Sequence, residues 1–285
     1  MLEIDPVTDP SRAHPGAASP AGSASELAQE NFVERCHPEG RARCLVVCDH
    51  AGRKIPRRLG TLGLPEHELR RHIGWDIGAA DVTRRLALLL DAQAVLCHSS
   101  RLVIDPNRKP GGLGSIPEIS DGTFVPANQD LGAAEIRRRL ATCFLPYHRA
   151  VARSIARLRR YSGIPAVISI HSFTPIMQRG WRRWEVAVLW DEDDRLAAPV
   201  LEELRRDPDL RVGDNEPYSG GYPVGYTIPF HARRPGLPHV TFEVRQDLID
   251  TESRAAAWGE RLALILQPLL RDPALYHRWN GAPWR

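Results

Sequence analysis

A short apolar run with a β-branched centre, Cys44-Leu-Val-Val-Cys48, is followed directly by the polar stretch Asp49-His-Ala-Gly52. A continuous apolar run of this length is typical of a strand that is buried on both faces in a parallel sheet. The polar residues that follow it predict a functional loop at the carboxyl end of that strand.

The alternation of strand-like and helix-like runs continues along the chain and predicts its fold class. Further strands are predicted at residues 94–97, 166–170, 185–190 and 239–245. Helical spacing of apolar residues predicts helices over 65–68, 76–90, 133–161, 196–205 and 251–270, and Pro146 should break or kink the helix over 133–161. Residues 106–132 and 213–220 are expected to be loops. We infer a single α/β domain whose mostly parallel or mixed central sheet is flanked by helices.

The first forty residues differ in composition from the rest of the chain. Residues 6–25 are rich in Pro, Ala, Gly and Ser and carry almost no large apolar side chains. Such a segment buries too little surface to offset the entropy of ordering it. We expect residues 1–40 to form a mobile leader with a short helical turn over 26–34, and residues 41–285 to form the folded domain.

The composition argues against several classes of protein. A net charge of +3 over 285 residues is too small to indicate binding to nucleic acid or to an anionic membrane. The arginine-dense face between positions 137 and 160 lacks interleaved aromatics, so a solvated helix face is favoured over a nucleic-acid patch. We expect no membrane span and no secretory signal. The five cysteines are an odd number, which suits free thiols in the cytoplasm.

Candidate site residues gather at the carboxyl ends of the predicted strands. His50 and His171 each come directly after a buried apolar strand. Glu243 lies within the last strand, and Asp76 precedes a helix. Two histidines and a carboxylate are a frequent ligand set for catalytic zinc, which keeps one position open for water. A further carboxylate would be the base for that water, and an arginine such as Arg101 would stabilise the oxyanion.

Each of these assignments has a structural alternative. His50 and His171 could be core histidines bonded to backbone carbonyls, although their matching places after strands favour metal ligation. Asp76 could instead cap the helix that follows it. Glu243 could pair with Arg245, because alternation puts both side chains on the same face of the strand.

A second polar stretch, Ser99-Ser-Arg-Leu-Val-Ile-Asp-Pro-Asn-Arg108, follows the strand at 94–97. Its two arginines and its asparagine suit a carboxylate and an oxyanion, because a guanidinium group binds planar oxyanions through two parallel hydrogen bonds. The alternative is a surface turn with a local ion pair to Asp105. Together with the histidines and Glu243, the stretch is better explained as the substrate side of a metal site.

Other mechanisms lack their sequence signals. No Gly-x-Ser-x-Gly motif supports a serine hydrolase. No glycine loop of the Walker or dinucleotide type follows a predicted strand, and no Cys-x-x-Cys pair indicates structural zinc or redox chemistry.

Several motifs, in order along nearly the whole folded part, resemble those of the N-formylglutamate amidohydrolase family. They are Asp49-His-Ala-Gly52, Gly74-Trp-Asp-Ile-Gly-Ala79, Ser100-Arg-Leu-Val-Ile-Asp-Pro-Asn-Arg108, Pro146-Tyr-His148, His171-Ser-Phe-Thr-Pro175, Asn215-Glu-Pro-Tyr-Ser219 and Glu243-Val-Arg-Gln-Asp247. That family is related to the zinc carboxypeptidases and aspartoacylases. The resemblance implies a phosphorylase/hydrolase-like α/β fold and hydrolysis of an N-formyl or N-acyl amino acid.

The resemblance also implies roles for individual residues. His50 and His171 are similar to the metal histidines, and Glu243 to the general base. Arg101 resembles the arginine that polarises the scissile carbonyl. The wider group places a glutamate ligand three residues after the first histidine, where this chain has Arg53, so Asp76 is the substitute ligand. Asn107 and Arg108 resemble the pair that holds the substrate carboxylate. We expect the remaining substrate-binding residues to be Ser172, Tyr218, His231 and Arg245.

The expected reaction is metal-dependent hydrolysis of N-formyl-L-glutamate to glutamate and formate, with Zn²⁺ or another divalent metal as cofactor. One alternative is a related amidohydrolase that acts on another small N-acyl amino acid. The other is a metal-free carboxylate-binding protein of the same fold.

Overall fold

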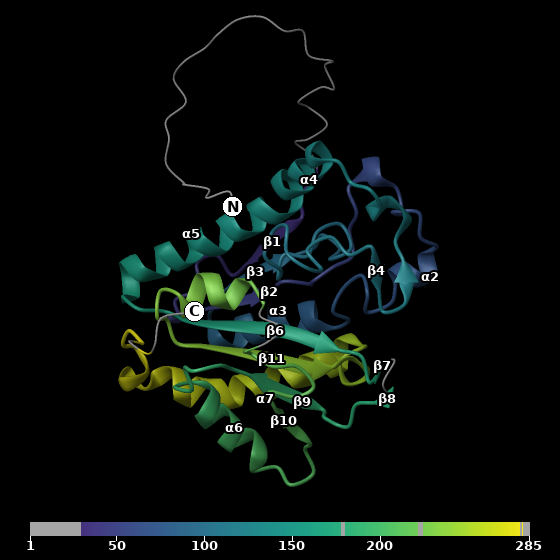
Figure 1. Cartoon of the computed structure of the whole chain (residues 1–285). Helices are drawn as coiled ribbons and strands as arrows, with labels where there is room; N and C mark the ends of the chain where they lie inside the picture. Colours follow the sequence, from purple (N-terminus) through teal and green to yellow (C-terminus); the bar gives the residue numbers. More distant parts are fainter. Residues whose placement is uncertain (1–29, 178–179, 222–224, 280, 282–285) are drawn as a thin grey trace, which may run out of the picture. The chain divides into compact units, whose positions relative to one another are not determined.

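The strands predicted from the sequence form one central sheet (Figure 1). The structure is a computed structural model that describes residues 30–177, 180–221, 225–279 and 281. Within these residues the sheet has seven strands, in the spatial order β1 (Val33–Cys36), β3 (Gln93–Cys97), β2 (Cys44–Cys48), β6 (Ala166–Phe173), β11 (His239–Arg245), β9 (Val186–Leu189) and β10 (Val212–Asp214). Neighbouring strands are parallel, except that β1 is antiparallel to β3 and β9 is antiparallel to β11. This mixed, mostly parallel sheet confirms the predicted fold class.

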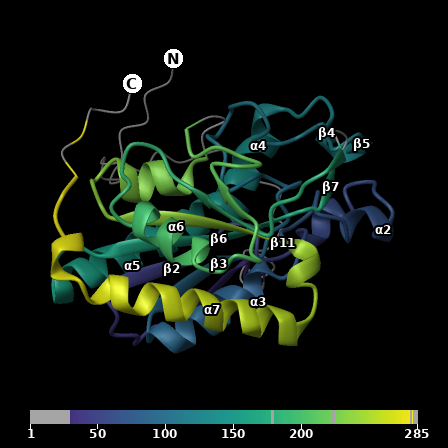
Figure 2. The same ribbon diagram turned by 90° about the horizontal axis from the view of Figure 1, so that it is seen from below.

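Helices cover both faces of the sheet. They are α2 (Glu66–Leu69), α3 (Ala79–Leu90), α4 (Ala133–Arg139), α5 (Leu145–Ser162), α6 (Ala197–Arg205) and α7 (Glu252–Arg271). Apolar side chains of α3, α6 and α7 form one cluster with one face of the strands, and those of α5 form another with the opposite face. Helices α3 and α7 pack directly against each other beneath the sheet (Figure 2). No helix in the described ranges is long and apolar enough to cross a membrane.

Shorter elements occupy the connections between these helices and strands. They are the hairpins β4 (Ile119–Ser120) with β5 (Thr123–Phe124) and β7 (Ile176–Met177) with β8 (Gly180–Trp181), the 3₁₀ helices η1 (Arg57–Leu59), η2 (Pro126–Asn128), η5 (Gln246–Leu248) and η6 (Pro273–Leu275), and the π-helical stretches η3 (Leu140–Phe144) and η4 (Pro229–Arg233). A third apolar cluster forms around the buried residues Leu102, Val103 and Ile104. The polar stretch 99–108 is therefore anchored by its apolar centre.

The helical region predicted over residues 133–161 is divided as the sequence indicates. Helix α4 ends at Arg139, η3 follows, and α5 begins at Leu145 with Pro146 in its first turn. Proline fits the first turn of a helix because the amide it lacks would have no partner there. The helical backbone continues from α4 through the π-helical stretch η3 into α5, and Pro146 lies just after that stretch.

The amino-terminal part of the domain differs from the sequence prediction. Residues 1–29 of the expected leader lie outside the described residues, and the folded unit begins at Phe32. The helical turn expected over 26–34 is wrong where it is described, because Val33–Cys36 extends as the edge strand β1 beside β3. An isolated helical turn is marginally stable, whereas pairing with β3 satisfies backbone groups and buries part of Val33. Similarly, the loop expected from residue 213 starts inside strand β10.

Candidate active site

Three residues predicted from the sequence lie together at the carboxyl ends of central strands, because these strands are neighbours in the sheet. His50 follows β2, His171 lies near the end of β6, and Glu243 lies near the end of β11. His171 extends the strand that was predicted to end at Ile170. All three line a cavity of about 360 Å³. Open α/β sheets bind ligands at the carboxyl ends of their strands, so the cavity is the candidate active site.

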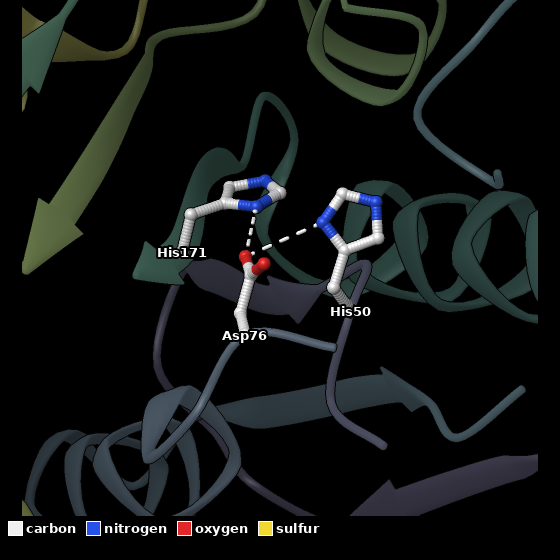
Figure 3. Close-up of side chains that lie close together, drawn as sticks. All are labelled: His50, Asp76 and His171. Atoms are coloured by element: carbon white, nitrogen blue, oxygen red, sulfur yellow. Dashed lines mark hydrogen bonds and ion pairs between the residues drawn. The ribbon is translucent and has the colours of Figure 1, made fainter. Parts of the chain in front are cut away.

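His50, Asp76 and His171 converge on one point (Figure 3). The Oδ2 atom of Asp76 lies 2.8 Å from Nδ1 of His171 and 3.3 Å from Nδ1 of His50. One potential ligand atom from each residue lies within 4.8 Å of the others, and all three side chains are buried. Asp76, the carboxylate predicted to replace a glutamate ligand at position 53, therefore lies beside the two histidines. Arg53 instead forms an ion pair with Glu66.

The position of Asp76 is fixed by close packing of its loop. The Asp76 amide donates to the His50 carbonyl at 2.9 Å. Gly78 has a φ of +80°, and a Cβ atom there would lie 2.0 Å from the Ile249 carbonyl oxygen. Helix α3 begins only at Ala79, with Gly78 in the capping position, so the alternative role of Asp76 as a helix cap is not observed.

A second carboxylate holds the other nitrogen of each histidine. His50 Nε2–H donates to Asp105 Oδ1 at 2.8 Å, and His171 Nε2–H donates to Asp49 Oδ2 at 3.1 Å. A carboxylate behind an imidazole fixes the tautomer and raises the basicity of the metal-binding nitrogen. In the neutral tautomer, both Nδ1 lone pairs then face the Asp76 carboxylate. This set of converging acceptors fits a divalent cation.

The pKa shifts of His171 and Asp76 reflect the excess of carboxylates around the two imidazoles. Burial opposes protonation of His171, but hydrogen bonds to Asp49 and Asp76 outweigh it and raise its pKa well above the ordinary value. Burial would raise the pKa of Asp76, yet the two imidazoles hold it well below the ordinary range. Protons thus compensate the carboxylates where a metal ion would otherwise do so.

Glu243 is a buried carboxylate without a hydrogen-bond partner for its Oε2 atom among the described residues. Burial, assisted by the charge of Asp76, raises the pKa of Glu243 to about 7. The alternative ion pair with Arg245 is not formed, because Arg245 pairs with Asp247 at 2.8 Å. A carboxylate in this state can take up and release a proton near neutral pH.

Arg101 lies beside the cluster of His50, Asp76 and His171 and lines the same cavity. Its guanidinium group donates to Asp76 Oδ1 at 3.3 Å and to Asp105 Oδ2 at 3.0 Å, and the side chain is 26% exposed. The local ion pair expected as the alternative function of the stretch 99–108 therefore exists. It also holds the guanidinium group at the cavity wall.

The remaining substrate-binding candidates divide into two groups. Asn107, Arg108, Ser172 and Tyr218 line the cavity. Asn107 Oδ1 accepts hydrogen bonds from the amides of residues 226 and 227 at 2.7 and 3.1 Å, and its side-chain nitrogen has no hydrogen-bond partner among the described residues. The Arg108 guanidinium contacts the carbonyl oxygen of Asn107 and forms no ion pair with a described carboxylate.

His231 and Arg245, by contrast, do not line the cavity in the described part of the chain. His231 stacks on His148, and its Nε2–H donates to His148 Nδ1 at 3.0 Å. His148 in turn donates from Nε2 to the Pro106 carbonyl at 2.9 Å, next to Asn107. This histidine pair therefore supports the loop that carries Asn107.

Asp49, which directly follows strand β2, has a role in the site that its sequence position alone does not reveal. Asp49 is fully buried and also accepts hydrogen bonds from the hydroxyl groups of Tyr147 at 2.7 Å and Thr227 at 2.6 Å. These partners lie 98 and 178 residues away in sequence. The only local signal was the adjacency of Asp49 and His50, which suggests a second carboxylate near the first histidine.

Taken together, the cavity holds a potential divalent-cation site, an unpartnered carboxylate that can carry a proton, and two arginines for negative charge. This combination is suited to hydrolysis of an amide in a small molecule that bears a carboxylate.

Comparisons with known proteins agree with this chemistry. The crystal structure of a gene product from Agrobacterium tumefaciens has a TM-score of 0.81 and 36% sequence identity, over 85% of this chain and 96% of that one. The structure of N-formylglutamate amidohydrolase from Ralstonia eutropha shares the fold, with a TM-score of 0.66 and 19% identity over 84% of this chain and 96% of that one. None of the curated proteins compared with the chain matches it. A family model described as N-formylglutamate amidohydrolase matches residues 42–250. The chain belongs to the N-formylglutamate amidohydrolase family.

Proposed function

We propose that the protein hydrolyses the amide bond of a small N-formyl amino acid and releases formate and the free amino acid. N-formyl-L-glutamate is the first substrate to test, because the family is named for its hydrolysis. The observation that carries the proposal is the unpartnered Glu243 carboxylate in the same cavity as His50, Asp76 and His171. A carboxylate base beside a cluster of potential metal ligands is an arrangement that supports metal-assisted hydrolysis of an amide.

His50, Asp76 and His171 would hold the cofactor, Zn²⁺ or another divalent metal. When bound, such an ion lowers the pKa of water toward neutrality and polarises a carbonyl group. Asp49 and Asp105 orient the two imidazoles from behind.

Glu243 carries the proton in this proposal. Its Oε2 atom takes a proton from the attacking water as the oxygen bonds to the formyl carbon. It then passes this proton to the departing nitrogen when the carbon–nitrogen bond breaks. A pKa of about 7 suits both transfers, because neither protonation state is strongly favoured at neutral pH.

The two arginines contact different oxygen-bearing groups of the substrate. Arg101 holds the oxygen of the scissile carbonyl, on which negative charge develops. Arg108 and the amide nitrogen of Asn107 bind the substrate carboxylate, and Ser172 and Tyr218 complete the cavity wall. His231 and Arg245 are assigned supporting roles, through His148 and Asp247 respectively.

All five cysteines are free thiols. Free thiols support a reducing compartment, and we propose the cytoplasm.

The test is to strip the protein of metal, restore Zn²⁺, and follow formate release from a panel of N-formyl and N-acetyl amino acids. Glu243→Gln should reduce kcat at least about a hundredfold while stoichiometric metal binding is kept. Glu252→Gln, a surface change of the same type on α7, is the matched control. Turnover of only the acetyl substrates would favour the related-amidohydrolase alternative. No turnover and no metal uptake would favour a carboxylate-binding protein.

A further inference from the structure

A second cavity, of about 300 Å³, lies where helix α5 packs against strands β1 and β3. It is lined by residues 93 and 94, which begin β3, so it lies at the amino end of that strand. The candidate active site lies at the carboxyl edge of the sheet, so the two cavities are separate. A volume of this size is at the lower end of small-molecule sites.

Four arginines line this second cavity, which we call the basic cavity: Arg35 from β1 and Arg153, Arg157 and Arg160 from α5. The helical arginines are spaced by four and three residues, so they share one face of α5. Val33 packs into the apolar cluster on the α5 side of the sheet, and Arg35 points the same way because strand side chains alternate. The fold itself therefore directs these guanidinium groups toward one space.

The charge in the basic cavity is poorly compensated by the protein. Arg157 pairs with Glu39. Arg35, Arg153 and Arg160 form no ion pair or hydrogen bond with the described residues, and no acidic side chain lines the cavity. These three side chains are exposed, so their guanidinium groups are open to an anion from solvent.

Two largely buried polar residues, Ser154 and Gln93, also line this space. Ser154 is 7% exposed and Gln93 is 5% exposed. The Ser154 hydroxyl group forms no hydrogen bond with the described residues, and the one hydrogen bond of the Gln93 side chain is a 3.5 Å contact from Nε2 to the Gly40 carbonyl. Both side chains line the basic cavity and add neutral hydrogen-bonding groups beside its guanidinium groups.

We propose that the basic cavity binds the diphosphate group of a small molecule. Three unpaired guanidinium groups match the charge of a diphosphate better than that of one carboxylate. Their forked donors suit phosphate oxygens, and the Ser154 hydroxyl and Gln93 amide add neutral donors. This proposal is independent of the amidohydrolase reaction.

The experiment measures binding of inorganic diphosphate and of adenosine diphosphate to the full-length protein by calorimetry. The double variant Arg153→Gln/Arg160→Gln should weaken binding at least about tenfold, because charged hydrogen bonds to phosphate are lost. The double variant Arg149→Gln/Arg159→Gln is the matched control, because it removes the same charge from exposed positions of α5 that do not line the basic cavity. A bound ligand should also raise Tm in the wild type and the control.

Tighter binding of adenosine diphosphate than of inorganic diphosphate would identify a nucleotide as the ligand, and equal binding would identify the diphosphate group alone. Equal weakening in both double variants would overturn the proposal, since it would mean non-specific attraction to a basic helix. Absence of binding to the folded wild-type protein would overturn it as well.

Discussion

His171 and Glu243 are register partners in the neighbouring parallel strands β6 and β11. Both side chains therefore lie on the same face of the sheet and reach the same cavity. A slip of one residue between these strands would move one of the two side chains to the opposite face. The pairing of β6 with β11 thus sets the relation between the proposed base and the proposed metal ligand.

The two arginines of the stretch 99–108 should have separable kinetic effects. Arg108→Gln is expected to raise KM about tenfold or more with little change in kcat, because substrate and transition state carry the same carboxylate. Arg101→Gln is expected to lower kcat about a hundredfold, because charge on the carbonyl oxygen develops only in the transition state. Steady-state kinetics on metal-saturated protein would measure both effects, and a reversed pattern would exchange the two roles.

The carboxylates behind the histidines should tune metal affinity. Asp49→Asn and Asp105→Asn are each expected to weaken Zn²⁺ binding about 10- to 100-fold, because the imidazoles lose their orienting acceptors. Asp121→Asn provides the control, since Asp121 lines the same cavity but pairs with Arg71. Competition with a chelating dye would measure the affinities. Similar losses in all three variants would indicate a general effect of charge in the cavity.

The buried histidine pair should make the fold sensitive to acid. Burial lowers the pKa of His148 to about 4 and that of His231 to about 3, from an ordinary value of 6.5. The unfolded chain therefore binds protons below pH 6.5 that the folded chain does not, and stability falls as the pH drops toward 4. For His148 alone the loss amounts to roughly 3 kcal/mol.

Urea denaturation between pH 7 and pH 4 would test this. His148→Gln should flatten the pH dependence of the free energy of unfolding, because one buried titrating group is removed. His67→Gln is the matched control, because it removes a histidine whose side chain is 76% exposed. An unaltered slope in His148→Gln would assign the acid sensitivity to other groups.

Gly78→Ala should destabilise the loop that carries Asp76. The new methyl group would meet the Ile249 carbonyl in a backbone conformation that favours glycine, so a loss of more than about 1 kcal/mol is expected. Gly60→Ala separates the two causes, because Gly60 has a φ of +53° but no atom within 4 Å of the added Cβ. Thermal unfolding and Zn²⁺ affinity of both variants would measure the difference. A loss no larger than that of Gly60→Ala would mean that backbone strain alone is responsible.

The central strands could be predicted because their signal is local. The runs at 44–48 and 166–170 are apolar and β-branched because both faces of these strands are buried. Strand β1 carries no such signal, since an edge strand mixes polar and apolar residues and depends on its partner. Its sequence alone could not distinguish it from a helical turn.

Site residues that directly follow a strand could be predicted from the sequence. Those whose orientation depends on contacts with distant parts of the chain could be predicted less well. His50 and His171 share that local context, and the structure brings Asp76 to them. The orientation of Arg245 toward Asp247 and of His231 toward His148 depends on packing that alternation does not encode. The same is true of the hydrogen bonds that tie Asp49 to Tyr147.

Asp105 has a consequence for how changes at this site combine. One carboxylate accepts hydrogen bonds from the imidazole of His50, the guanidinium group of Arg101 and the backbone amide of Asn107. Residues that share a partner show coupled rather than additive effects. In a double-mutant cycle, Asp105→Asn combined with Arg101→Gln should therefore cost less than the sum of the single changes. The residues proposed to bind the metal and those proposed to bind the substrate are therefore energetically coupled through their shared contact with Asp105.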